Sequence, residues 1–216
     1  MSGRTALRTD DGLAMGASRY VSCGGKTVHY LEWDGPEKET MVIWHGATGT
    51  CRDHAKLARR LAGSYRVICP DSPGSGLSDW LPKETGAYGL SHLSELVEAF
   101  LDQIDVGRFT WIGTSRGGLL GIRLAGGNCR DRVTRLVLND VAPTVPQPFR
   151  DFIVREFTPM PDFPTLSSFH AYVREFVGST SRVKLSDDEW HDLSQAWWRR
   201  RDDGRITFHF DPALMT

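Results

Sequence analysis

Four short apolar runs alternate with segments of helical periodicity along the middle of the chain. The apolar runs are Met41–Trp44, Tyr65–Cys69, Phe109–Ile112 and Val133–Leu138. Helical spacing predicts helices over residues 52–62, 91–104 and 117–125, and Ser91 is a candidate cap for the second of these. Strands that alternate with helices of this length predict an α/β fold with a mostly parallel sheet, whose strands are buried on both faces.

A hairpin precedes these units. Residues 19–23 and 26–33 read as strands, and Gly24 and Gly25 between them supply the positive φ values of a two-residue turn. Asp34-Gly35-Pro36 marks the end of the hairpin. We therefore expect residues 1–18 to be a loose N-terminal arm, and residues 19–142 to form a core whose sheet starts with antiparallel strands.

The pattern changes after residue 142. Prolines interrupt the chain, and two amphipathic helices are predicted, one with an apolar face within residues 169–177. The second starts at a capping box of Ser186 and Glu189 and carries Trp190, Leu193 and Trp197 on one face. We expect residues 143–216 to be a helical cap region. The basic run Trp198–Arg201 is interpreted as the solvated end of a helix.

Composition excludes several classes of protein. The 216 residues include 26 lysines and arginines against 27 acidic residues, without the basic excess of a nucleic-acid binder. No apolar stretch approaches the roughly 20 residues of a membrane-spanning helix, and the first ten residues do not form a secretion signal. Four scattered cysteines form no CxxC pair. We expect a cytoplasmic protein without metal or cofactor.

The segment Gly113–Gly118 matches G-x-S-x-G and lies between a predicted strand and a predicted helix. Such an abrupt turn holds Ser115 in a strained conformation, and glycine is needed two residues to either side because side chains there would collide. The serine hydroxyl then projects above the carboxyl edge of the sheet. The N–H of Arg116, at the start of the helix, can stabilise a developing oxyanion.

Two further motifs follow strands in the same order. His45-Gly46-Ala47 ends the first apolar run, and Asp71-Ser72-Pro73-Gly74-Ser75-Gly76-Leu77-Ser78 follows the second. With the serine turn, they make residues 19–216 resemble the α/β-hydrolase fold family. The resemblance implies that the amide of Ala47 is the second oxyanion donor, that His45 is structural, and that the loop starting at Asp71 is mostly architectural.

A serine at the turn excludes the family's haloalkane dehalogenases and epoxide hydrolases, which carry aspartate there. The resemblance therefore implies a serine hydrolase that acts on a small acyl substrate through an acyl-enzyme. Esters, thioesters, lactones, amides and the C–C bonds of diketones are the candidate substrates.

The family's catalytic acid usually follows the seventh strand and its histidine the eighth, whereas about six strands are counted here. We therefore expect a sheet without the last two strands, a truncated chain with little turnover, and an acid and base beyond Thr216. Weaker candidates for these roles are Asp140, His170, His191 and His209. The side chain of Arg116 is expected to contact the cap or a substrate carboxylate.

Two other interpretations stay open. The chain is alternatively a non-catalytic ligand-binding protein on a hydrolase scaffold, or one with an unusual catalytic dyad in the cap. Two roles are open for the tryptophans of this region, which either line an acyl pocket or pack the cap on the sheet. They are Trp190, Trp197 and Trp198. An uncovered edge at Val133–Leu138 would favour a homo-oligomer.

Overall fold

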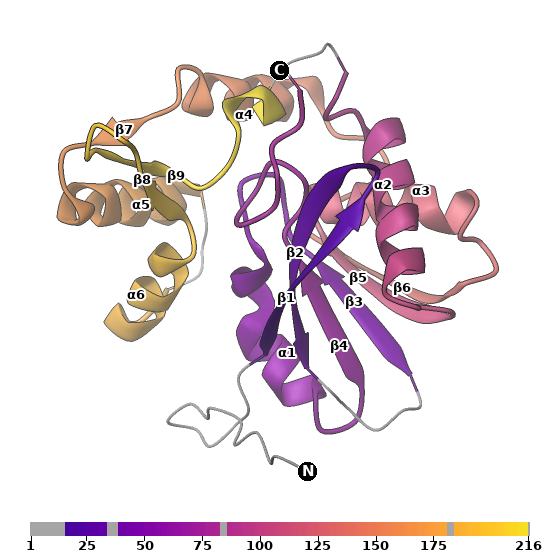
Figure 1. Ribbon diagram of the computed structural model, residues 1–216. Helices are drawn as coiled ribbons and strands as arrows, with labels where there is room; N and C mark the ends of the chain where they lie inside the picture. Colours follow the sequence, from indigo (N-terminus) through magenta and orange to yellow (C-terminus); the bar gives the residue numbers. More distant parts are fainter. Residues whose placement is uncertain (1–15, 34–38, 83–85, 181–183, 216) are drawn as a thin grey trace.

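The computed structural model describes residues 16–33, 39–82, 86–180 and 184–215. Within these ranges a six-stranded sheet has the order β1-β2-β4-β3-β5-β6 (Figure 1). Its strands are β1 (Ala17–Cys23), β2 (Lys26–Trp33), β3 (Thr40–Trp44), β4 (Arg66–Pro70), β5 (Phe109–Thr114) and β6 (Val133–Asn139). All the predicted strands of the core are present.

The sheet is antiparallel at its start and parallel beyond, as predicted. β1 pairs with β2 through the turn at Gly24 and Gly25, whose φ values are 57° and 76°. These values match a type I′ turn, which suits the twist of the two strands. β2 pairs antiparallel with β4, and β4, β3, β5 and β6 are parallel neighbours.

Helices cover both faces of the sheet (Figure 1). Alternate residues of β3 face opposite sides: Val42 and Trp44 join a core cluster with α2, whereas Ile43 joins a cluster with α1. The run from Met41 to Trp44 is continuously apolar for this reason. The helices are η1 (Cys51–His54), α1 (Ala55–Leu61), α2 (Leu90–Gln103) and α3 (Arg116–Gly126).

The predicted cap of α2 is wrong. The helix starts one residue earlier than expected, so Ser91 lies inside it, and Gly89 occupies the capping position without a side-chain hydrogen bond. The carbonyl of Ser91 instead accepts a 2.7 Å hydrogen bond from the hydroxyl of Ser94.

Residues after β6 form a separate layer beside the sheet, which we call the cap (Figure 1). It contains both predicted helices and a helix that was not predicted. It also contains a three-stranded antiparallel sheet of order β7-β9-β8, in addition to the helices. Its elements are α4 (Gln147–Phe157), β7 (Asp162–Phe163), α5 (Leu166–Thr180), α6 (Asp187–Gln195), β8 (Trp198–Arg200), β9 (Ile206–Phe208) and η2 (Pro212–Met215).

The basic run after α6 is also corrected. Trp198–Arg200 is strand β8 rather than the end of a helix, and Trp197 lies outside α6. The guanidinium of Arg199 lies 4.8 Å from the ring centre of Trp80, a cation–π contact with the core.

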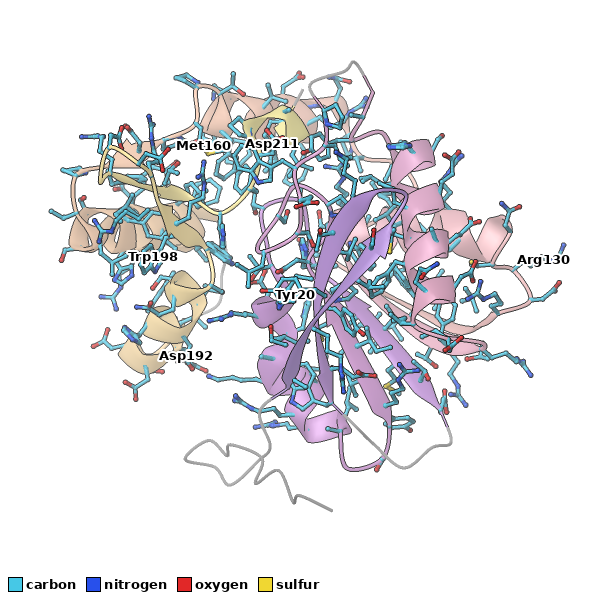
Figure 2. The ribbon with its side chains drawn as sticks, in the orientation of Figure 1. Tyr20, Arg130, Met160, Asp192, Trp198 and Asp211 are labelled. Atoms are coloured by element: carbon cyan, nitrogen blue, oxygen red, sulfur yellow. The ribbon has the colours of Figure 1, made fainter. Side chains whose placement is uncertain are left out.

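Side chains from α6 and its C-terminal flank fasten the cap to α1 and η1. The indole N–H of Trp197 donates a 2.9 Å hydrogen bond to Oδ1 of Asp53, and Nζ of Lys56 lies 3.2 Å from Oδ2 of Asp192. Asp192 projects from α6 on the side of the cap seen at the lower left of Figure 2. Trp197 therefore packs the cap on the core, one of the two roles considered for the tryptophans.

Two expectations fall largely or wholly outside the described residues: the arm at residues 1–18, of which only residues 16–18 are described, and the turn at Asp34–Pro36.

No described helix has the length and apolar character needed to cross a membrane. β6 has a neighbour in the described sheet on one side only, and Val137 and Leu138 on it are 47% and 39% exposed.

Candidate active site

The strand-to-helix turn at Ser115 is the most strained feature of the core. β5 ends at Thr114, α3 begins at Arg116, and Ser115 between them has φ 50° and ψ −115°. A non-glycine residue in such a conformation costs about 1–3 kcal/mol and persists only where the surroundings impose it. Here they do, because the Ser115 N–H donates a 2.9 Å hydrogen bond to Asn139 on β6.

The flanking glycines are required by close backbone packing. A Cβ on Gly113 would lie 2.3 Å from the carbonyl oxygen of Gly117. A Cβ on Gly117 would lie 2.4 Å from the carbonyl oxygen of Trp44, at the end of β3. The predicted crowding is therefore present, but at Gly117 the conflicting group belongs to the neighbouring strand rather than to residue 113.

The turn after β3 lies against Ser115. A Cβ on Gly46 would be 3.5 Å from Cβ of Ser115. Both ring nitrogens of His45 are occupied, since Nδ1 donates to the Gly46 carbonyl at 2.6 Å and Nε2 accepts from the Ser72 N–H at 2.8 Å. Burial, the largest influence, lowers the pKa of His45, so the ring is neutral and fixed in one tautomer.

The two amides predicted to bind an oxyanion are those of Arg116 and Ala47. Arg116 is the first residue of α3, and the amides of a first helical turn have no partner within the helix. Ala47 follows Gly46, and its side chain packs against the apolar cluster of the cap, which is built around Phe157, Phe169 and Phe208. The site is thus covered by apolar side chains on the Ala47 side.

The side chain of Arg116 forms its hydrogen bond with the core. It is partly buried, and its guanidinium donates to the backbone carbonyl of Tyr88, in the loop before α2. Desolvation lowers the pKa of Arg116 to about 10, so the group remains charged at neutral pH. The expected contact with a substrate carboxylate stays a prediction.

Asp71 organises the loop that follows β4. Its carboxylate accepts hydrogen bonds from Nδ1 of His29 and from the N–H groups of Cys51 and Leu77, at 2.7, 2.7 and 2.9 Å. Burial, the largest single influence, raises the pKa of Asp71, but these donors and the nearby His45 outweigh it and the net shift is downward. A charged, fully engaged carboxylate is an architectural element of the loop.

Three buried groups could in principle hold a metal. Within the described ranges, ligand atoms of His29, Cys51 and Asp71 lie within 4.8 Å of one another. Nε2 of His29 is 2.8 Å from the hydroxyl of Ser18, its Nδ1 binds Asp71, and burial raises the pKa of the Cys51 thiol far above neutrality. Each group is thus committed to the hydrogen-bonded core, and we assign the trio a structural role.

None of the weaker candidates forms a hydrogen bond with the Ser115 hydroxyl among the described residues, although Asp140 directly follows Asn139, whose carbonyl accepts from the Ser115 N–H. His170 and His191 line a cavity of about 330 Å³ inside the cap, and His209 lines another of about 240 Å³ beside Asp71. Asp140 has a positive φ of 53° just after β6 and is exposed. All seven histidines of the chain are described, and none forms a hydrogen bond with the Ser115 hydroxyl.

One residue near the turn carried no functional prediction. Nε2 of His54 lies 3.4 Å from the hydroxyl of Thr114, directly before Ser115. Burial is the main reason that the pKa of His54 falls to about 4, so the ring is neutral at physiological pH. The contact joins residues 60 positions apart in the chain, so no local sequence signal reveals it.

Comparisons with known proteins agree on one family. The model of the α/β hydrolase fold matches residues 39–203. A 3-hydroxybutyrate-oligomer hydrolase of Cupriavidus necator is 33% identical over 204 residues, which cover 90% of this chain and 68% of that protein.

Two further matches cover different shares of the chain. A 2-hydroxy-6-oxononadienedioate/2-hydroxy-6-oxononatrienedioate hydrolase of Escherichia coli is 31% identical over 129 residues, 56% of this chain and 43% of that protein. The crystal structure of an α/β hydrolase from Novosphingobium aromaticivorans superposes with a TM-score of 0.82 and 30% identity, covering 94% of this chain and 71% of that one.

Proposed function

Since this chain belongs to the α/β-hydrolase fold family and is an esterase-like hydrolase of that fold, we propose that it is a serine hydrolase of small acyl substrates. Ser115 is the nucleophile, and the amides of Ala47 and Arg116 bind the oxyanion of the tetrahedral intermediate. The observation that carries the proposal is the strained Ser115 backbone, at φ 50°, between two glycines that backbone crowding requires.

The chemistry follows from that geometry. The Ser115 oxygen attacks the carbonyl carbon while a general base takes the hydroxyl proton, which then passes to the leaving group. The carbonyl oxygen takes negative charge, and the two amides stabilise it without reorganisation. Collapse of the intermediate expels the leaving group and leaves an acyl-enzyme, which water then hydrolyses. The apolar cap cluster beside Ala47 supports an acyl group of low polarity next to the oxyanion.

The relatives suggest which substrates to try first. Short hydroxybutyrate ester oligomers are the lead compounds, because the relative from Cupriavidus necator is named for them. Diketone C–C bonds come second, after the relative from Escherichia coli. We also propose a cytoplasmic location, which the four buried free thiols support because such thiols persist in reducing compartments.

A fluorophosphonate probe tests the nucleophile. We expect peptide mass spectrometry to place the probe on Ser115 and to find none on the Ser115→Ala variant. Ser64→Ala, at an exposed serine of a turn in the core, is the matched control and should be labelled like the parent. Labelling that persists in Ser115→Ala would refute the assignment.

One observation favours a second function. Because no imidazole of the described chain forms a hydrogen bond with the Ser115 hydroxyl, the same scaffold could bind a ligand between cap and core without turning it over. Tight ligand binding together with an unlabelled Ser115 would support the binding protein. Labelled Ser115 would support the hydrolase.

A further inference from the structure

Arg116 presents an electrostatic problem beside the proposed nucleophile. Its guanidinium is partly buried, carries five N–H donors, and has one hydrogen-bond partner among the described residues, the carbonyl of Tyr88. No described carboxylate lies within ion-pair distance of it. A cation withdrawn from water without a counter-charge is costly, so a cation retained in such a place calls for a functional reason.

Other arginines of the chain show the usual arrangement. Arg66 lies 2.8 Å from Glu32, Arg132 lies 2.7 Å from Asp102, and Arg205 lies 2.7 Å from Asp162. Arg66 and Arg132 are partly buried, as Arg116 is, and each of them has a carboxylate partner. Arg116, which is joined directly to Ser115, is partly buried and has no such carboxylate partner among the described residues.

The position of the charge points toward the proposed site. Burial is the main cause of the lowered pKa of His45, and the charge of Arg116 also contributes. The guanidinium therefore acts on the same turn that places Gly46 against Ser115. Tyr88, the hydrogen-bond partner of Arg116, also binds an acid: its phenol donates to Asp211 at 2.6 Å. Asp211 forms no ion pair with Arg116 itself.

We propose that the Arg116 guanidinium binds a carboxylate of the substrate, so that the preferred substrates are acyl compounds with a free carboxylate near the bond that is cleaved. This inference rests on the proposed function, because it presumes that Ser115 attacks the substrate. A carboxylate would supply the missing counter-charge, and the planar fork of arginine suits a paired contact with its two oxygens. Arg116 then determines specificity through its side chain, while its backbone amide serves the oxyanion.

Matched substrates test the subsite. We would compare kcat/KM for the mono(4-nitrophenyl) ester of glutaric acid with that for 4-nitrophenyl hexanoate, a neutral ester of similar length. The parent should prefer the acid, and Arg116→Gln should reduce the acid-to-neutral ratio roughly 10- to 100-fold, the range of a charge-assisted hydrogen bond. Arg116→Lys should keep part of the preference. Arg123→Gln, at an exposed arginine of the same helix, should leave the ratio unchanged.

Binding provides a readout that does not need turnover. In the Ser115→Ala background, isothermal titration with glutarate should show binding that Arg116→Gln abolishes and Arg123→Gln retains. Should Arg116→Gln fail to fold, the same comparison with Arg116→Lys keeps the test valid. Equal loss on the acid and neutral esters, or glutarate binding that is unaffected by Arg116, would overturn the subsite. A probe that labels a residue other than Ser115 would instead overturn the proposed function.

Discussion

The phenol of Tyr88 donates a 2.6 Å hydrogen bond to the carboxylate of Asp211, across 123 positions of sequence. Both side chains are buried, at 8% and 3% exposure. Tyr88 precedes α2 in the core, and Asp211 follows β9 of the cap, at the upper centre of Figure 2. The Asp211 N–H also donates to the Gly74 carbonyl at 2.7 Å. Asp211 therefore fixes the cap segment after β9 to the core loop that follows β4.

Removing the Tyr88 hydroxyl should weaken this connection. In Tyr88→Phe, Oδ2 of Asp211 loses its donor and the N–H of Leu81 loses its 2.8 Å acceptor. We expect a loss of about 1–3 kcal/mol in the free energy of unfolding, measured by urea denaturation. Tyr65→Phe, at a tyrosine outside this contact, is the control. A loss below that of the control would show that the contact does not stabilise the fold.

The crowding around the serine turn predicts opposite effects at two glycines of α3. Gly117→Ala places a methyl group against the Trp44 carbonyl, 2.4 Å away, and should destabilise the protein by about 1–3 kcal/mol or more. Gly126→Ala has no neighbour within 4 Å and should stabilise it by about 0.5–1 kcal/mol, since alanine is the better helix former. Thermal unfolding of both variants checks this, and equal melting temperatures would contradict the packing around Ser115.

Asp53 predicts a pH dependence of stability. Burial, the largest influence, raises its pKa to about 7, against the hydrogen bonds from Trp197 and Thr50, which lower it. Between the unfolded pKa near 4 and the folded value, the native state holds a proton that the unfolded chain has lost. This group therefore stabilises the fold fully below about pH 4, and its contribution is lost as the pH rises through 7.

Melting curves of the parent and of Asp53→Asn between pH 5 and 8 measure this contribution. The parent should lose stability relative to the variant as the pH rises. Asp192→Asn, at an exposed acid on the other side of the same interface, should follow the parent. Parallel curves for the parent and Asp53→Asn would mean that Asp53 titrates normally.

The exposed side chains of β6 predict self-association. Val137 and Leu138 are 47% and 39% exposed on a strand with one described neighbour, and uncovered strand edges promote pairing with other chains. Light scattering after size exclusion should show a mass that increases with concentration, and Val137→Lys should reduce the effect. Val154→Lys, on the exposed face of α4, is the control. A monodisperse monomer of the parent at all concentrations would refute the prediction.

Local rules predicted the core well, because its elements depend on near neighbours. The apolar run at Met41 and the glycine turn at Gly24 each reflect a pattern of a few residues. The cap was harder. The prolines after residue 142 predict interruptions of the chain, although proline is acceptable in the first turn of a helix, as Pro148 is in α4. The sequence predicts a helix end at strand β8, because its arginines find partners only through folding, as Arg199 does with the ring of Trp80.

At the candidate site, too, local features could be predicted from the sequence and long-range contacts could not. The conformation of Ser115 could be predicted because G-x-S-x-G between a strand and a helix encodes its own steric requirement. The direction of the Arg116 side chain could not, since it depends on the loop at Tyr88, 28 residues earlier. The Tyr88–Asp211 contact joins core and cap, and no sequence spacing announces it.

The central claim is that Ser115 attacks an acyl carbon beside the amides of Ala47 and Arg116. The crystal structure of the fluorophosphonate-treated protein tests it most directly. We predict phosphorus bonded to Oγ of Ser115, with the phosphoryl oxygen within hydrogen-bond distance of both amide nitrogens. A phosphorus atom on another residue, or an oxygen directed away from both amides, would contradict the account.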